Sequence, residues 1–337
     1  MNEQINKQYV LEVINLGVSF DTDEGVVRGV NDVSFKVPKA KTLGIVGESG
    51  SGKSVASQAI LHLLPKNGYI DEASEIFLEK NDESINITDL NADSKEMRSI
   101  RGGSISMIFQ EPMASFSPVY TIGNQMLESI QLHRKVSKGE AQEIALDMLD
   151  RVGISNPGVR IDQYPFELSG GMRQRAMIAM ALSTEPLLLI ADEPTTALDV
   201  TIQAQILELM RQLQDDLNMS IMFITHDLGV IAQIADEVVV MYLGQVMERG
   251  TTREIIKESA HPYTKSLLNA IPKLDLLHDR LIPIGGDIPS PLARPPGCPF
   301  HTRCPDFIPG KCEIADPGQT KLSETHFVSC FLFEQEG

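Results

Sequence analysis

One stretch of eight residues has the composition of a phosphate-binding loop. The run G-E-S-G-S-G-K-S fits the pattern G-x-x-x-x-G-K-[ST] at every fixed position. It lies between the apolar strand expected at Thr42–Val46 and a helical pattern that runs from Ser54 through Leu64. In that context main-chain N–H groups and the positive end of a helix can surround phosphate oxygens. The expected nucleotide contacts come from Gly47, Glu48, Ser49, Gly50, Ser51, Gly52, Lys53 and Ser54.

Two residues of this loop have distinct expected roles. The Lys53 ammonium would reach the β- and γ-phosphates of a nucleotide, and the Ser54 hydroxyl would coordinate Mg²⁺. The alternative is a glycine-rich turn that binds nothing. The strand before the loop and the helix after it favour the phosphate-binding interpretation.

An acidic pair follows a second apolar run. Residues 187–191 read L-L-L-I-A, which is typical of a buried parallel strand, so Asp192 lies at the carboxyl end, where open α/β sheets bind ligands. Asp192 would hold Mg²⁺ through water, and Glu193 could orient or deprotonate an attacking water. Taken alone, such carboxylates are more often solvated residues at a strand end. Their occurrence together with a phosphate loop favours the catalytic interpretation.

Three single residues complete the candidate set. Gln110 ends an apolar strand expected at Ile105–Phe109, and its amide could touch both Mg²⁺ and a moving subdomain. Asp199 follows closely after Glu193, and His226 follows the strand expected at 220–225, where it could meet the γ-phosphate. Each alone is more often structural than catalytic. Their order along the chain reverses that expectation.

The run Leu168-Ser169-Gly170-Gly171-Met172 lies about one helix ahead of the acidic pair. Together, these motifs resemble the nucleotide-binding subunit of ATP-binding cassette (ABC) transporters in order and spacing, from Leu11 to about Gly250. The resemblance implies that Ser169, Gly170 and Gly171 complete the ATP site of a partner subunit. A glycine without Cβ permits close approach to a phosphate; the alternative is an exposed turn that caps the helix expected at 172–182.

The resemblance also implies an aromatic residue stacked on adenine, for which Phe20 is the candidate. A core phenylalanine at the end of a strand is an equal alternative.

The composition fits a protein without nucleic-acid or membrane-spanning function. The chain has 337 residues, with 46 acidic against 29 basic, and a net charge of -17, which argues against a nucleic-acid surface. No apolar stretch reaches the ~18 residues that suggest a membrane span, and the polar N-terminus lacks a signal core. We therefore expect a peripheral protein on the cytoplasmic side of the cell membrane.

The elements that must position these residues predict an α/β fold. The resemblance implies a P-loop ATPase of the ABC type with an N-terminal antiparallel β region, a helical subdomain and a small irregular C-terminal extension. We expect an ATP-binding domain over residues 1–250, with a helical subdomain at about 111–182, and an extension over 251–337. The predicted segments are strands at 11–20, 26–37, 187–192 and from Glu237, a loop-rich stretch at 79–96, and helices at 122–133, 138–152, 202–217, 228–235, 252–259 and 263–270.

All four cysteines lie near the C-terminus, spaced Cys298-x5-Cys304-x7-Cys312-x17-Cys330. A reducing cytoplasm disfavours disulfides. The paired knuckles usual for structural zinc are absent, and neither ferredoxin spacing is matched. An iron–sulfur cluster, zinc and buried thiols without metal therefore all remain open.

The C-terminal segment resembles the extension found in the ATPases of oligopeptide and dipeptide importers. The matching stretches are His261-Pro262-Tyr263, Gly297–Phe300, Arg303–Pro305, Cys312 and His326–Cys330. This resemblance points to a [4Fe-4S] cluster on the four cysteines. It also implies ATP-driven import of peptides with two membrane permease subunits, a second homologous ATPase and an extracytoplasmic solute-binding protein.

Other functions stay open beside peptide import. Related importers carry nickel or oligosaccharides, and ABC ATPases outside transport act in DNA repair or on the ribosome. The interval from Ser54 to Leu168 holds no sustained heptads and the chain has one cassette, which disfavours the non-transport classes. An inactive ATPase is disfavoured because Lys53, Asp192, Glu193 and His226 are all present.

Overall fold

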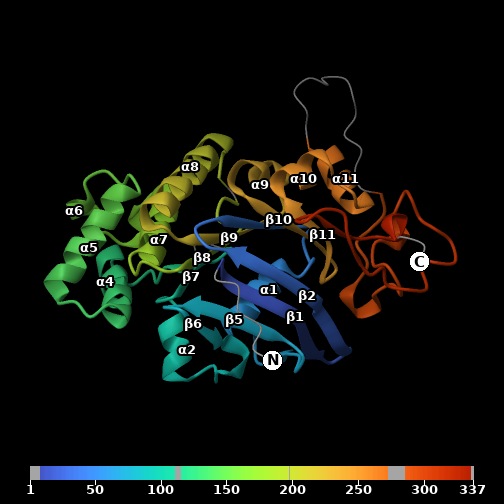
Figure 1. Cartoon of the computed structure of the whole chain (residues 1–337). Helices are drawn as coiled ribbons and strands as arrows, with labels where there is room; N and C mark the ends of the chain where they lie inside the picture. The colour runs from blue at the N-terminus through green and yellow to red at the C-terminus, as the bar shows by residue number, and fades with distance from the viewer. Residues whose placement is uncertain (1–7, 111–114, 197, 272–284, 335–337) are drawn as a thin grey trace. The chain divides into compact units, whose positions relative to one another are not determined.

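The structure is a computed structural model that describes residues 8–110, 115–196, 198–271 and 285–334 (Figure 1). The chain divides into two compact units, and the segments of one unit alternate along the sequence with the segments of the other. Unit 1 consists of Met1–Val10, Val37–Lys41 and Leu78–Ile224, and unit 2 of Leu11–Lys36, Thr42–Phe77 and Thr225–Gly337.

Parallel strands form the centre of unit 1. Strand β8 (Leu188–Asp192) pairs in parallel with β7 (Ile105–Ile108) and with β9 (Ser220–Thr225). Every residue of β8 and β9 is buried, which explains why these segments are continuously apolar rather than alternating. The parallel register brings the residues after β7 and β8 to the same edge of the sheet.

Helices form the other part of unit 1. Helix α4 (Ile122–His133) packs on α5 (Lys138–Arg151), and both contact α7 (Gly170–Leu182), while α6 (Pro157–Arg160) packs on α5 (Figure 1). Side-chain caps fix where α4 and α5 begin: Thr121 accepts from the N–H of Asn124, and Ser137 forms a capping box with Glu140. The helices predicted at 122–133 and 138–152 are confirmed. Residues 111–114 of the expected helical subdomain lie outside the described residues.

The stretch expected to be loop-rich contains regular structure. Strand β5 (Glu75–Lys80) crosses from unit 2 into unit 1, where it pairs with β6 (Glu83–Asn86). A 3₁₀ turn η1 (Ile87–Asp89) and helix α2 (Lys95–Ile100) follow. The acidic composition obscured these elements, although Asn86 and Ser94 act as helix caps.

Unit 2 contains an antiparallel β region, as predicted. Strand β1 (Tyr9–Thr22) pairs with β2 (Gly25–Pro38) and with the short β4 (Gly68–Ile70).

The strands that unit 2 contributes to the eight-stranded sheet have the order β12-β13-β11-β10-β3. Strand β3 (Thr42–Val46) runs parallel to β10 (Glu237–Tyr242), which pairs antiparallel with β11 (Gln245–Thr251). The C-terminal extension adds β13 (Phe327–Ser329) to β11, and β12 (Gln319–Lys321) to β13. The expectation of an irregular extension is therefore incomplete, because it contributes two short strands to this sheet.

The described residues of unit 2 also form the helices α1 (Lys53–Ile60), α9 (Leu228–Ile234), α10 (Thr252–Lys257) and α11 (Pro262–Asn269). The prediction that the helix after the phosphate loop continues to Leu64 is wrong. The chain adopts a left-handed conformation at His62, with φ of 50°, and this ends the helical hydrogen-bonding pattern. Within the described residues, no helix has both the length and the apolar composition that crossing a bilayer requires.

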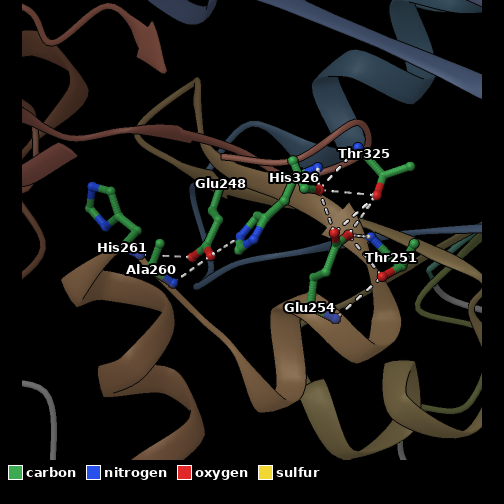
Figure 2. Close-up of polar contacts among 8 residues, drawn as sticks. Glu248, Thr251, Glu254, Ala260, His261, Thr325 and His326 are labelled. Atoms are coloured by element: carbon green, nitrogen blue, oxygen red, sulfur yellow. Dashed lines mark hydrogen bonds and ion pairs between the residues drawn. The ribbon is translucent and has the colours of Figure 1, made fainter. Parts of the chain in front are cut away.

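A buried carboxylate fastens the extension to β11. Glu248 is fully buried and accepts hydrogen bonds from the N–H groups of Ala260 (2.7 Å) and His261 (3.0 Å) (Figure 2). His326, next to β13, lies with Nε2 2.7 Å from a Glu248 oxygen. One side chain thus joins β11, the start of α11 and the C-terminal segment.

Candidate functional site

The candidate residues divide between the two units. Unit 2 carries the phosphate loop, Phe20, His226 and the four cysteines, whereas unit 1 carries Gln110, Ser169, Gly170, Gly171, Asp192, Glu193 and Asp199.

The phosphate loop connects β3 to α1, as the sequence predicts. Gly50 and Gly52 have φ values of 78° and 94°, which L side chains rarely adopt. At Gly47 a Cβ would lie 2.1 Å from the carbonyl oxygen of Met241, so only glycine fits. The loop's own backbone therefore requires glycine at positions 50 and 52, and the close approach of Met241 requires it at position 47.

Lys53 spans the loop from the first turn of α1. Its side chain is 5% exposed, and Nζ donates to the carbonyl oxygens of Gly47 (2.7 Å) and Glu48 (3.0 Å) and to Oγ of Ser51 (3.2 Å). The ammonium is thus held at the loop, where a phosphate would sit. Ser54 follows it in α1, while Ser49 and Gly50 are exposed at the loop's tip.

In unit 2, the contacts of Phe20 and His226 do not by themselves indicate a role in nucleotide binding. The half-buried Phe20 ring fills the space beside Gly29 and Gly68, since a Cβ on either glycine would come within 3 Å of the ring. This packing would suit a core role, and adenine stacking stays a prediction. His226 is exposed between β9 and Asp227, which caps α9 by accepting from the N–H groups of Gly229 and Val230.

In unit 1 the structure brings Gln110 and Glu193 together. Nε2 of Gln110 donates to Oε2 of Glu193 at 3.4 Å, and the Thr196 hydroxyl donates to the same oxygen at 2.9 Å. Glu193 has φ of 47°, in the left-handed region, and its N–H donates to the carbonyl of Ile224 at 2.9 Å. Such a backbone costs about 1–3 kcal/mol for a residue other than glycine and is frequent at functional sites.

The neighbouring Asp192 ends β8 and is 2% exposed. Gln174, 1% exposed in α7, donates from Nε2 to the carbonyl oxygen of Pro194 and so ties this helix to the segment after Glu193. Sequence reasoning missed both Gln174 and Thr196. A glutamine inside a helix has no distinguishing local pattern.

The L-S-G-G element forms the start of α7. Ser169 is the N-cap and accepts from the N–H of Met172 at 3.3 Å. A Cβ on Gly170 would meet nothing within 4 Å, and one on Gly171 would lie 3.7 Å from Ile202. The described part of this chain therefore does not itself demand glycine at these two positions.

Asp199 has a capping role. Its Oδ1 accepts from the N–H of Ile202 at 2.9 Å and thereby fixes the start of α8 (Val200–Leu217). Ala197, two residues earlier, lies outside the described residues.

The four cysteines are free thiols, three of them buried. Burial, and to a smaller extent the neighbouring thiols, raise the pKa of Cys298 to about 12. Burial likewise raises the pKa of Cys304 to about 11 and raises that of Cys330. Raised pKa values favour protonated sulfur, whereas a metal ligand must be a thiolate.

No metal centre is formed by these thiols as they are arranged. Among the residues that the structure describes, which include all four cysteines, no group of three or more His, Cys, Asp or Glu side chains has the arrangement to hold a metal ion. The predicted [4Fe-4S] cluster and its zinc alternative on Cys298, Cys304, Cys312 and Cys330 are therefore not supported by this geometry.

Comparison with known families gives two matches on this chain. The model of the ABC transporter family matches residues 30–196, and that of the oligopeptide/dipeptide transporter C-terminal region matches residues 247–312.

Individual relatives match almost end to end. The chain is 51% identical over 327 residues to the dipeptide transport ATP-binding protein DppD of Bacillus subtilis, which covers 97% of this chain and 95% of that protein. It is 48% identical over 323 residues to the oligopeptide transport ATP-binding protein OppD of Haemophilus influenzae, covering 96% and 97%.

A solved structure shares the fold. A dimeric bacterial ABC transporter cassette superposes with a TM-score of 0.63 at 26% identity, covering 72% of this chain and 99% of that one. The fold class predicted from the motifs is thereby confirmed. The chain belongs to the ABC transporter ATPases, in the group that carries the C-terminal region of oligopeptide/dipeptide transporters.

Proposed function

We propose that this chain binds and hydrolyses ATP and that hydrolysis powers the import of peptides through partner membrane subunits. The observation that carries the hydrolytic part is the Gln110–Glu193 hydrogen bond beside the buried Asp192. The relatives named for dipeptide and oligopeptide transport support the peptide part, because each matches nearly the full length of this chain. Residues 1–250 form the proposed ATP-binding domain, with the helical subdomain at about 111–182, and 251–337 the extension.

The residues have separate roles in this proposal. The phosphate loop and Lys53 bind the nucleotide phosphates through N–H donors and the ammonium. Glu193 orients the attacking water and accepts its proton, and His226 contacts the γ-phosphate. Mg²⁺, when bound, neutralises charge on the β- and γ-phosphates, and Ser54, Gln110 and Asp192 would hold it. Phe20 is the proposed adenine contact.

A second ATPase subunit completes each site in this proposal. Gly170 and Gly171 have room for a Cβ within the described part of the chain, which supports a need for glycine imposed from outside it. Ser169 exposes its hydroxyl at the N-terminus of α7, where an anion is favoured. These residues would contact ATP held on the phosphate loop of a homologous chain, and Asp199 is a further proposed nucleotide contact. The dimeric state of the solved cassette that shares this fold agrees with that assembly.

An ABC importer ATPase works with membrane permease subunits, and unit 1 offers an apolar contact site for them. A cavity of about 490 Å³ is lined by residues that include Met107, Phe109, Met177, Met180 and Ala181, and Phe109 directly precedes Gln110 in the sequence. Phe109 is 43% exposed. We propose that a helix of one permease subunit occupies this cavity, so that its movement reaches Gln110. Met180→Glu should then abolish assembly with the permease while the isolated chain still binds ATP.

The cargo is tested in a reconstituted system. The chain, its partner ATPase, two permease subunits and the solute-binding protein are placed in liposomes, and uptake of a labelled dipeptide is measured with ATP on the side that represents the cytoplasm. ATP-dependent uptake supports the proposal. Uptake of nickel or an oligosaccharide in place of peptide would assign the alternative cargo.

The four cysteines are the proposed ligands of an iron–sulfur cluster, with zinc as the alternative. The N–H of Ile308 donates to Sγ of Cys312 at 3.4 Å, and main-chain hydrogen bonds partly offset the effect of burial on the pKa of Cys298, Cys304 and Cys330. Such bonds stabilise thiolates. The test is metal analysis after anaerobic purification: about four irons per chain and absorption at about 400 nm support a cluster. Stoichiometric zinc would support the alternative, and metal-free protein would refute both.

A further inference from the structure

Arg303 of the C-terminal extension forms an ion pair with Glu48, the second residue of the phosphate loop. Nη1 of Arg303 donates to Oε2 of Glu48 at 2.6 Å, and Nη2 donates to Oε1 at 3.0 Å. The side chains of Arg303 and Glu48 are 3% and 21% exposed, so the pair is largely shielded from water. A two-pronged guanidinium–carboxylate pair fixes both charge and orientation. The two residues are 255 positions apart and both belong to unit 2.

The surroundings of Arg303 hold its side chain in one orientation. Its Nε donates to the carbonyl of Gly285 at 3.0 Å, and Nη1 also lies 3.2 Å from the Tyr242 hydroxyl. The guanidinium lies 5.7 Å from the centroid of Tyr242 and 6.0 Å from that of Phe300. These two rings and Tyr263 form a fully buried aromatic cluster, with centroids 4.8–5.3 Å apart.

The same cluster holds the main chain of Glu48. The N–H of Glu48 donates to the Tyr263 hydroxyl at 2.9 Å, and Tyr263 belongs to α11 in the extension. The carbonyl oxygen of Glu48 accepts from Nζ of Lys53 at 3.0 Å. Glu48 is therefore held on one side by the extension and on the other by the lysine expected to bind phosphate.

The negative charge of Glu48 makes its pairing with Arg303 important for nucleotide binding. A carboxylate in a loop that receives a polyanion opposes binding unless a cation compensates it. Arg303 supplies that cation from a shielded position, where screening by salt is weak. Loss of the arginine would leave Glu48 both uncompensated and free to reorient.

We propose that Arg303 is a positioning residue of the ATP site, through which the C-terminal extension neutralises and orients Glu48 so that the phosphate loop accepts ATP. This inference rests on the proposed ATP-binding function. It gives the extension a direct role in the site, independent of whether its cysteines carry a metal.

The experiment measures the affinity of the full-length chain for Mg-ATP by calorimetry, with thermal unfolding of each variant as a check of folding. Arg303→Gln should weaken ATP binding by at least about tenfold, because an uncompensated carboxylate then lies in the loop that binds the phosphates. Arg303→Lys should weaken it less, since lysine keeps the charge but loses the fork. Arg253→Gln is the matched control, because Arg253 also pairs with a glutamate (Glu258, 3.8 Å) but is exposed, and ATP affinity should not change.

The double variant Glu48→Gln/Arg303→Gln separates charge compensation from a general loss of structure. If compensation is the role of Arg303, removing both charges should recover most of the affinity lost in the single variant. In the assembled transporter, Arg303→Gln should raise KM for ATP more than it lowers kcat.

Two results would overturn the inference: wild-type ATP affinity in a folded Arg303→Gln protein, or a double variant as weak as Arg303→Gln. If Arg303→Gln does not fold, a wild-type KM for ATP in Arg303→Lys would overturn the inference instead. Failure of the wild-type chain to bind Mg-ATP would instead refute the proposed function, so the two failures are distinguishable.

Discussion

The amide of Gln110 donates to the carboxylate of Glu193 at 3.4 Å across 83 residues of sequence. The Thr196 hydroxyl donates to the same carboxylate oxygen, and the backbone of Glu193 is in the left-handed region. These contacts keep the side chain at the carboxyl edge of the parallel strands of unit 1. Gln110 is therefore expected to act both on Glu193 and, through Mg²⁺, on the nucleotide.

Gln110→Ala should lower ATP turnover by about tenfold, because one oriented hydrogen bond to the catalytic carboxylate is lost. Turnover of the assembled transporter is the measurement. Gln212→Ala is the matched control, since Gln212 also donates to a glutamate, Glu208, at 3.3 Å but on an exposed face of α8. Equal turnover in both variants would show that Gln110 has no role in ATP hydrolysis.

Lys53→Ala should weaken ATP binding itself by at least about tenfold, because the ammonium at the loop is lost. Calorimetry with Mg-ATP measures it. Lys36→Ala removes a lysine that pairs with Glu12 at 2.6 Å on the β1–β2 surface and should leave the affinity unchanged. An unaltered affinity in Lys53→Ala would contradict the assignment of the loop.

Ser169→Arg should impair the ATP site that contains the other subunit's phosphate loop, because a bulky cation replaces the capping hydroxyl of α7. The mutant is combined with a partner whose own L-S-G-G element is intact, and turnover is measured for each site. A loss confined to the site containing Lys53 of the mutated chain would refute the composite arrangement.

Unfolding should become easier as the pH falls below about 6.5 because of His261. Burial lowers the pKa of His261 from 6.5 to about 3 in the folded chain, so the unfolded chain binds the proton first. The stabilisation from neutral His261 is thus complete above pH 6.5 and is lost as the pH falls toward the folded pKa of about 3. His261→Asn keeps a capping acceptor for the N–H of Tyr263 but cannot be protonated there.

Urea unfolding of both proteins between about pH 6.5 and 5 tests this assignment, because few carboxylates titrate in that window. The wild type should lose stability over this interval, and His261→Asn should lose less. Identical changes of stability with pH in the two proteins would show that another group is responsible.

At lower pH Glu254 contributes too: burial alone would raise its pKa, but hydrogen bonds from Ser323, Thr251 and Thr325 lower it to about 2.

Local sequence patterns predicted the elements that have strong periodicity or caps. Strand β3 and helix α4 have the predicted bounds, because a continuous apolar run and the Thr121 cap define them. The apolar residues after Ile60 continued the helical pattern, yet the chain turns at His62. Strands β12 and β13 have three residues each and are too short to show a period.

The sequence could not predict contacts between residues that lie far apart in the chain. The Arg303–Glu48 and Glu248–His326 pairs join positions 255 and 78 residues apart, and no local motif marks any of these residues as a partner. Gln110 and Glu193 were each proposed from their place after a strand. Their mutual hydrogen bond follows from the parallel register of β7 and β8, which only the structure gives.

The most direct test of the account is ATP turnover by the assembled transporter with Glu193→Gln. The amide keeps the size of the side chain but cannot accept a proton, so ATP binding should persist while turnover falls by at least about 10²-fold. Calorimetry and steady-state phosphate release measure the two quantities on the same preparation. Unchanged ATP affinity with turnover reduced to this extent is the result we predict, and turnover near that of the wild type would contradict the role of Glu193.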